Sequence, residues 1–193
     1  MGPITLRGGR ELEDPLAMVV EFIAAYPGYD SQDAAANSFD ERDLRLANRG
    51  GARISGAEQT AILERRGQIE GALRGIGPDA SLLEAQVPWA ALTRLFGGFG
   101  EIRGVGFSKM TKALHRKRPA LIPILDSVVQ AYLALDDPPE SFAEHATALV
   151  RTYKEDLDRN RSALRSIRRE LAARGHELTE VRILDIVIWL AHA

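Results

Sequence analysis

The sequence contains no cysteine, and this absence removes several classes of chemistry at once. A chain without thiols forms no disulfide bond, holds neither zinc nor an iron–sulfur cluster through thiolates, and has no cysteine nucleophile. The four histidines show no metal-ligand spacing either: they are His115, His145, His176 and His192. We therefore expect neither a metal nor another cofactor.

Long apolar runs are also missing. No stretch approaches the roughly 18 apolar residues of a membrane span, and the opening MGPITLRGGRELEDP contains no apolar signal core. Hydrophobic residues nevertheless make up 45% of the 193 positions, which is enough for a core. We expect a cytoplasmic protein without a membrane partner, and its oligomeric state stays open.

Charge is small in total but uneven along the chain. The net charge is −2, yet residues 11–43 hold nine acidic side chains against one basic one. Residues 103–118 hold six basic side chains and no acidic one, and residues 159–174 hold six arginines and one glutamate. Such a chain can bind a polyanion locally, or its opposite charges can pair when it folds. For the arginines of residues 159–174 we favour a solvated face that pairs with the acidic segment.

Strand signals are scarce, whereas helix caps and apolar residues at helical spacing recur. The pattern predicts an all-α, two-lobed bundle of about nine or ten helices in a single domain over residues 1–193. A break near residues 75–78 or near residues 97–100 would separate the lobes. The expected helices cover residues 15–26, 55–74, 89–96, 107–116, 127–135 and 180–191, with further ones starting at capping signals near Ser38, Ser81 and Ser141.

A glycine turn, Gly104-Val105-Gly106, precedes the helix expected at residues 107–116. Glycine allows a tight turn and a close approach to a ligand, and the unpaired N–H groups at a helix start suit a phosphate. Arg103, Lys109 and Lys112 would surround this point with positive charge. The basic run His115–Arg118 fits two roles equally: compensating the helix C-terminus, or contacting backbone phosphates.

Asp126 follows the turn after one helix and an apolar strip, Leu121–Leu125. The arrangement resembles the helix–hairpin–helix DNA glycosylase superfamily, which is endonuclease III-like. That superfamily has a turn of the form L-P-G-V-G-x-K-T-A, followed at nearly this spacing by P-V-D-T-H-V. The motif would cover residues 88–117, and Pro123–Val129 resembles the second element with one extra residue before the aspartate. The sequence also resembles an uncharacterised bacterial family of unknown function, with GVGFSKMTKALHRKRPALIP and a closing ILDIVIWL.

The resemblance implies binding of double-stranded DNA through the hairpin and its basic helix. The implied contacts are Arg103, Gly104, Val105, Gly106, Ser108, Lys109, Lys112, Arg116, Lys117 and Arg118. Asp126 would be the catalytic carboxylate of a monofunctional glycosylase, stabilising an oxocarbenium-like state during cleavage of an N-glycosidic bond. Ser108 stands where bifunctional relatives have their lysine nucleophile, and Lys109 lies about 100° further around the helix.

Three alternatives stay open at this level. Asp126 also fits a plain N-cap of the helix that follows it. The protein then becomes either a non-catalytic DNA-binding module or an all-α interaction scaffold whose basic face meets an acidic partner. Asn48–Gly51 is interpreted as a helix end and turn, and the two tryptophans as core residues. The aromatic residues considered for a base pocket are Tyr26, Tyr29, Phe39, Trp89 and Tyr132.

Overall fold

The computed structural model describes residues 2–28, 30 and 35–193, and it confirms the all-α class. Within these residues a two-stranded antiparallel ribbon, β1 (Ile4–Thr5) with β2 (Glu11–Leu12), is the only sheet. The helices are α1 (Pro15–Ala25), α2 (Glu41–Arg49), α3 (Gly56–Glu64), α4 (Arg66–Arg74), α5 (Trp89–Gly97), α6 (Phe107–Leu114), α7 (Ser127–Tyr132), α8 (Phe142–Arg159), α9 (Arg161–Ala173) and α10 (Glu180–His192), with short 3-10 helices η1 (Arg7–Gly9) and η2 (His115–Lys117).

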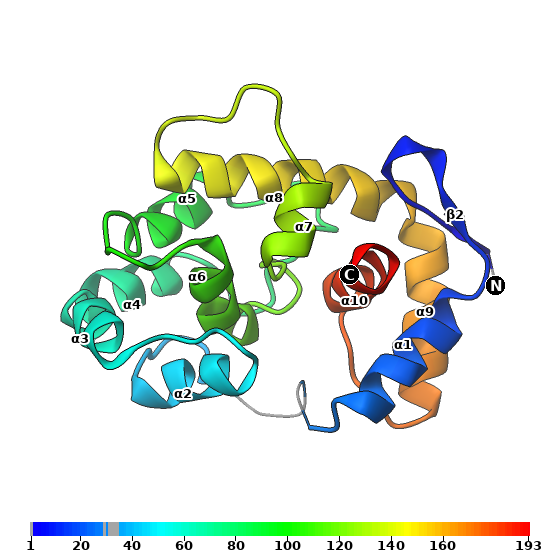
Figure 1. Cartoon of the computed structure of the whole chain (residues 1–193), viewed down its shortest axis with the longest axis horizontal. Helices are drawn as coiled ribbons and strands as arrows, with labels where there is room; N and C mark the ends of the chain where they lie inside the picture. Colours follow the sequence, from blue (N-terminus) through cyan, green and yellow to red (C-terminus); the bar gives the residue numbers. More distant parts are fainter. Residues whose placement is uncertain (1, 29, 31–34) are drawn as a thin grey trace.

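Figure 1 shows the helices in two groups, with α8 running across both and α7 between them. The first group comprises α2 to α6. In the second group α1 packs against α10 and α9, which come from the far end of the sequence. The division therefore does not follow the breaks at residues 75–78 and 97–100. The first group is built from consecutive helices. The second combines α1 with α9 and α10.

Helix α8 connects the groups because its apolar residues recur every three or four positions. Its buried face includes Ala146, Leu149, Val150, Tyr153 and Leu157, which gives the stripe expected of an amphipathic helix. This stripe packs mainly against α5 in the first group and also against α9 and α10 in the second. Helix α10 is buried on nearly every side from Glu180 to Ile188, as its apolar sequence predicts.

The capping signals have mixed outcomes. Ser55 and Glu58 form the predicted capping box of α3. The prediction at Ser38 is wrong, because Asp40 is the N-cap of α2 and shares its capping box with Asp43. The prediction at Ser81 is also wrong, since residues 81–86 form turns without a helix. A serine followed by an acidic residue also fits a turn, because the serine oxygen accepts a backbone N–H in both structures.

The single helix predicted for residues 55–74 is two helices. Arg65 leaves helical geometry, with φ −94° and ψ 9°, and both ends the first helix and starts the second. Its guanidinium donates to the carbonyl oxygen of Gly100 at 2.5 Å. The break bends the chain so that α4 packs against α5.

The arginines of residues 159–174 find local partners rather than the acidic N-terminal segment. Arg161 pairs with Asp158 at 2.7 Å, Arg168 with Glu180 at 3.2 Å and Arg174 with Glu170 at 2.9 Å. The acidic segment supplies Asp43 instead, whose carboxylate lies 2.5 Å from the ammonium nitrogen of Lys117. Each partner of these three arginines lies on α9 or on a helix next to it, α8 or α10, and so is closer than the acidic N-terminal segment.

Arg118 is the largest fully buried side chain among the described residues. Its guanidinium donates to the carbonyl oxygens of Leu73 (2.7 Å), Ile76 (2.7 Å) and Ala36 (2.6 Å), and to Asn37 Oδ1 (2.9 Å). These acceptors belong to the end of α4 and to the segment before α2. Arg118 therefore ties three stretches of the first group together.

Among the described residues, we find no helix with the length and apolar character required to cross a membrane.

We expect Arg118→Lys to lower the free energy of unfolding by at least about 3 kcal/mol, because one ammonium cannot serve carbonyls on several sides and each buried acceptor left unpaired costs about 1–3 kcal/mol. Urea denaturation measures the loss. Arg169→Lys, on the exposed face of α9, is the matched control and should change stability by less than about 0.5 kcal/mol. Equal stabilities of the two variants would contradict the role assigned to Arg118.

Candidate functional site

The turn before α6 is exposed at its polar positions and fixed by two buried apolar ones. Ile102 and Val105 are buried, whereas Arg103, Gly104 and Gly106 are exposed. The Val105 N–H donates to the Ile102 carbonyl at 3.0 Å and closes the turn. Gly104 has φ 86°, a conformation that favours glycine. The predicted turn therefore presents its backbone to solvent.

Gly104 also lies against the first turn of α3. A Cβ atom at this position would stand 2.2 Å from Glu58 Oε1. Glu58 cannot move aside freely, because its carboxylate accepts two bonds from the Lys109 ammonium, at 2.6 and 2.8 Å, and one from the Ser55 N–H. The hydrogen bond from Lys109 lowers the pKa of Glu58. Lys109, predicted to contact DNA, thus has an internal partner that fixes the turn.

Two other predicted DNA contacts need correction. The side chains of Lys117 and Arg118 are buried, and their N–H groups bond Asp43, the segment before α2 and the end of α4. A phosphate outside the protein does not reach them. The run His115–Arg118 is instead an internal structural element, since burial also covers His115. Of the predicted set, Arg103 is exposed, and Ser108, Lys112 and Arg116 are partly exposed.

The strip before Asp126 is held in place by three buried polar side chains. His115 Nδ1–H donates to the Ile122 carbonyl at 2.6 Å, and burial lowers the pKa of His115 to about 4, so the ring is neutral. The Ile124 N–H donates to Asp185 Oδ2 at 2.9 Å, and the Leu125 N–H donates to Thr111 Oγ1 at 3.0 Å. Helices α6, η2 and α10 thereby fix the position at which α7 begins.

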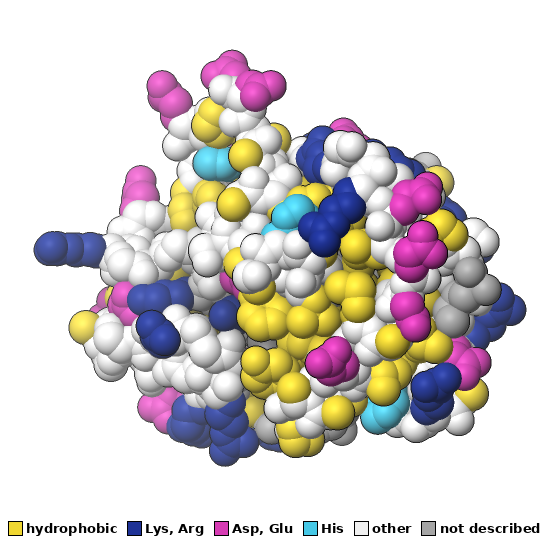
Figure 2. All heavy atoms as spheres, turned by 45° about the vertical axis from the view of Figure 1, so that its right-hand side comes forward, with side chains coloured by type: hydrophobic (Ala, Val, Ile, Leu, Met, Phe, Trp, Pro, Cys, Tyr) yellow, Lys and Arg dark blue, Asp and Glu magenta, His cyan; other side chains and the backbone are white. Residues whose placement is uncertain are grey.

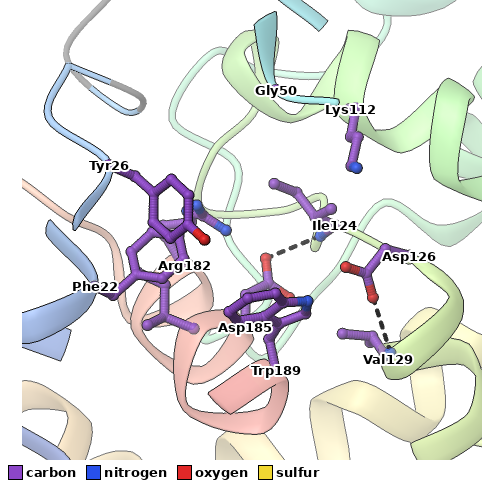
Figure 3. Close-up of a pocket in the computed structure, with 11 residues that line it drawn as sticks. Phe22, Tyr26, Gly50, Lys112, Ile124, Asp126, Val129, Arg182, Asp185 and Trp189 are labelled. Carbon is purple, nitrogen blue, oxygen red and sulfur yellow. Dashed lines mark hydrogen bonds between the residues drawn. The ribbon is translucent and has the colours of Figure 1, made fainter. Parts of the chain in front are cut away.

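Asp126 is the N-cap of α7, as the structural alternative predicted. Its Oδ1 accepts the N–H groups of Val128 and Val129 at 3.1 and 3.0 Å. Both bonds use one oxygen, and the carboxyl group also stands in the wall of a cavity (Figure 3). Capping and a role in the cavity are therefore compatible, because the cap occupies only one of the two carboxylate oxygens.

The cavity has a volume of about 170 Å³ and lies where the two helix groups meet. An engineered cavity of about 150 Å³ accepts benzene, so this volume corresponds to one small ring system. The walls come from α1, the end of α2, α6, the strip with α7, and α10. The lining residues are Phe22, Tyr26, Gly50, Lys112, Ile124, Asp126, Val129, Arg182, Asp185, Ile186 and Trp189.

Three aromatic side chains form one side of the cavity. Phe22 of α1 and Tyr26, the C-cap of that helix, lie one turn apart with ring centroids 4.9 Å apart. Trp189 meets them edge-on at 6.1 and 6.5 Å. Tyr26 is 48% exposed. The interpretation of Trp189 as a core residue is thus incomplete, because its indole lines the cavity. Figure 2 shows apolar side chains gathered at the centre of one face, with charged ones mainly around them.

The other aromatic candidates have different places. Phe39 is buried against Phe99, with ring centroids 5.9 Å apart. Trp89 lies under the Arg151 guanidinium at 4.1 Å. Tyr132 donates its hydroxyl to Asp156 at 2.7 Å. Tyr29 lies outside the described residues. Of the proposed aromatics, Tyr26 is the one that the structure places at the cavity.

Lys112 extends from α6 into the cavity, on the side where Asp126 lies (Figure 3). Burial lowers the pKa of its ammonium, and the negative charge of Asp126 opposes this effect. The loop after α2 covers the same region, since a Cβ on Gly51 would stand 3.8 Å from Lys112 Nζ. The predicted turn at Asn48–Gly51 is confirmed: α2 ends at Arg49, and the Asn48 side chain bonds both the N–H and the carbonyl of Ile54.

The sequence pattern did not single out two charged residues of the cavity, Arg182 and Asp185. Arg182, Asp185 and Trp189 recur at i, i+3 and i+7, so they share one face of α10. Arg182 donates to Asp30 at 2.8 Å and lies over the Phe22 ring. The signal was present in EVRILDIVIWLA, because a charged side chain inside an apolar helix is buried only when it has a structural or functional partner.

Asp185 has the most perturbed carboxyl group of the cavity. Its side chain is 2% exposed, and among the described residues its Oδ1 has no hydrogen-bond partner. Burial raises the pKa of Asp185 to about 8, and the charge of Arg182 opposes that rise. The carboxyl group therefore holds its proton at neutral pH. In the described part of the chain, no group of three or more His, Asp or Glu side chains is arranged to hold a metal ion.

A model described as a family of unknown function, DUF6308, matches residues 21–192. The chain belongs to this family. The matched range includes every residue that lines the cavity, from Phe22 to Trp189. No curated protein and no solved structure matches the chain significantly. In this DUF6308 member, the features that bear on function are therefore the geometry of the cavity and that of the turn.

We expect Asp185→Asn to stabilise the protein at pH 8 and to have little effect at pH 4. The folded pKa of about 8 exceeds the unfolded value of about 3.9. Below pH 4 the carboxyl group of Asp185 is protonated in both the folded and the unfolded state, so its burial causes no pH-dependent loss of stability there. As pH rises towards 8, the unfolded state ionises and the folded state loses relative stability by up to about 1.4 kcal/mol per unit. The asparagine removes this loss and keeps an acceptor for Ile124.

Thermal unfolding of the native protein and of Asp185→Asn between pH 4 and pH 8 checks this expectation. Asp137→Asn, at an exposed position after α7, is the control for removal of a surface charge. A native protein whose stability relative to Asp185→Asn does not change over this pH range would show that the carboxyl group ionises normally.

Proposed function

We propose that this protein binds double-stranded DNA through the exposed turn at residues 103–106. We further propose that it hydrolyses the N-glycosidic bond of a damaged or modified base held in the cavity. The observation that carries the proposal is the position of Asp126, whose carboxyl group stands in the wall of an aromatic-lined cavity with a volume of about 170 Å³. The resemblance of the turn and of Pro123–Val129 to DNA glycosylases supports the same assignment.

The cavity has the parts that this reaction requires. A base that has left the DNA stack needs an aromatic surface, which Tyr26 and Trp189 supply. As the bond between the sugar C1′ and the base nitrogen breaks, its electron pair leaves with the base and positive charge develops on the sugar. A fixed carboxylate stabilises that charge and accepts the proton of the attacking water. Asp126 is fixed by its cap bonds to Val128 and Val129.

The exposed turn supplies a surface for the DNA backbone. Gly104 and Gly106 expose their backbone, Arg103 adds a positive charge beside them, and Ser108 lies in the first turn of α6. Phosphate contacts of this kind position a protein on a duplex without reading its sequence. Selectivity would then reside in the cavity.

We expect Asp126→Asn to abolish base release from duplexes that contain damaged bases and to leave DNA binding unchanged. Asparagine is as good an N-cap as aspartate, so the fold should persist, whereas the neutral amide neither stabilises the cation nor accepts a proton. Single-turnover release of free base, measured by chromatography, and fluorescence anisotropy of the duplex provide the two readouts. Asp137→Asn is the matched control.

Other outcomes would favour the alternatives. Salt-sensitive DNA binding without release on any damaged duplex would favour a non-catalytic DNA-binding module. Absence of binding at low salt would favour an interaction scaffold and would remove the role assigned to the turn. Release that persists in Asp126→Asn would leave Asp126 as a cap only.

We expect Arg103→Ala to weaken binding similarly on all duplex sequences and to reduce the slope of log affinity against log salt by about 0.9, because one phosphate contact is lost. Arg169→Ala on α9 removes an equal charge on the other helix group and should leave the slope unchanged. Anisotropy titrations between 50 and 200 mM salt measure the slopes of both variants. Over this range a protein with about 6–10 phosphate contacts loses affinity strongly. Equal slopes for the two variants would exclude the turn as the DNA contact.

A further inference from the structure

Two positively charged side chains beside the cavity have no partner in the part of the chain that the structure describes. Lys112 extends from α6 into the cavity wall, and Arg53 is exposed on the loop between α2 and α3. Within the described residues, neither side chain makes a hydrogen bond or an ion pair. Charged groups that lose water are normally paired. A partly buried ammonium that faces a cavity without a partner therefore favours an anionic ligand.

The two cations stand near each other. A Cβ atom on Gly51 would lie 3.8 Å from Lys112 Nζ, and Arg53 follows Gly51 by two residues. Burial and the positive charges of Arg182 and Arg53 lower the pKa of Lys112, whereas the negative charge of Asp126 opposes these effects. Like charges that are held close together repel each other, and an anion bound between them would remove this repulsion.

The backbone of Arg53 is strained. Its φ of 55° lies in the left-handed region that residues with a side chain rarely adopt. The next residue holds it there, because Ile54 is buried and exchanges two hydrogen bonds with the Asn48 side chain, at 2.9 and 2.6 Å. Glycine would take this conformation without strain. Strained residues that their surroundings hold in place gather at ligand-binding sites, so an arginine at this position points to a use for its guanidinium.

The arrangement of these groups fits one nucleotide. Figure 3 shows Tyr26 on one side of the cavity and Lys112 with Asp126 on the other. A base that lies against the aromatic side would direct its sugar toward Asp126. A cavity of about 170 Å³ takes the base alone, so the phosphate would extend to the rim, where Arg53 is exposed. A guanidinium donates to phosphate through a planar fork, and an ammonium adds a compact charge.

We propose that Lys112 and Arg53 bind the phosphate group of a nucleotide whose base lies against the aromatic side of the cavity. The nucleotide is an extruded unit of DNA or a free nucleoside monophosphate, and both sources share this phosphate chemistry. The inference rests on the proposed function for the position of the base. It goes beyond that function because it adds a phosphate site separate from the turn at residues 103–106.

Deoxyuridine and deoxyinosine, each compared with its 3′- and 5′-monophosphates, test the proposal without DNA. Trp189 reports binding by fluorescence in a Trp89→Phe background, because the chain has two tryptophans and Trp89 lies under Arg151, outside the cavity lining. We expect at least one monophosphate to bind about tenfold more tightly than its nucleoside. Added salt should reduce this advantage, because it screens the attraction between the phosphate and the exposed guanidinium.

Two substitutions assign the advantage to the two cations. Lys112→Met keeps a long apolar side chain and removes the charge, whereas Arg53→Gly removes the guanidinium and suits the left-handed backbone. Each should reduce the advantage of the monophosphate by about threefold or more and leave the affinity for the nucleoside unchanged. Arg42→Gln, at an exposed position in the first turn of α2, removes an equal charge and should preserve the advantage.

The two sources of the phosphate give different results on DNA. If the phosphate belongs to DNA, Lys112→Met should reduce the slope of log affinity against log salt by about 0.9 on duplexes that contain a damaged base. If the site serves free nucleotides, this slope should be the same in the native protein and in Lys112→Met, while the free monophosphate binds the variant more weakly.

Three results would each overturn the proposal. They are no binding of any monophosphate, equal affinities of the native protein for nucleoside and monophosphates, or the full advantage retained in either variant. The comparison of nucleoside with monophosphate keeps the native side chains at positions 53 and 112, so it decides the matter even if a variant does not fold. Base release from DNA is measured separately. A preference for the monophosphate without release would reject the hydrolysis alone, whereas release without such a preference would reject the phosphate site alone.

Discussion

The site depends on how the strip from Ile122 to Leu125 is held. This strip belongs to no helix or strand, so no regular secondary structure pairs its polar backbone groups, and a buried backbone group without a partner is costly. His115 of η2, Thr111 of α6 and Asp185 of α10 supply the missing partners. Because the strip leads directly into Asp126, these three bonds set where α7 begins and therefore where its capping carboxylate stands relative to the cavity.

Two buried ionisable groups illustrate opposite uses of burial. Arg118 donates to acceptors on several sides, so its desolvation is offset and it connects parts of the first helix group. Asp185 makes one hydrogen bond through Oδ2 and retains its proton instead. A group of the first kind contributes to stability. A group of the second kind lowers stability at neutral pH, and proteins commonly keep such destabilising arrangements at sites that serve a function.

The fold class and most helices could be predicted from the sequence because apolar spacing and caps are local signals. The cap at Asp126, the turn at residues 104–106 and the helix end at Arg49 belong to this group. Other features depend on contacts between distant segments. Nothing local shows that Lys117 meets Asp43, that Arg65 interrupts a helix, or that α1 packs against α10. The cavity consequently could not be predicted, although the charged residues Arg182 and Asp185 within an apolar helix indicated that something polar lies beside it.

The pairing of α1 with α10 has a consequence for how the site comes into existence. Phe22 and Trp189 contact each other in one wall of the cavity although almost the whole described chain separates them in sequence. Contacts of such long range form late, because the closure of a long loop precedes any gain from the contact. During synthesis the first helix group can complete its packing while the cavity still lacks one wall. The site is therefore assembled by the last segment of the described chain to emerge, and no shorter nascent intermediate contains it.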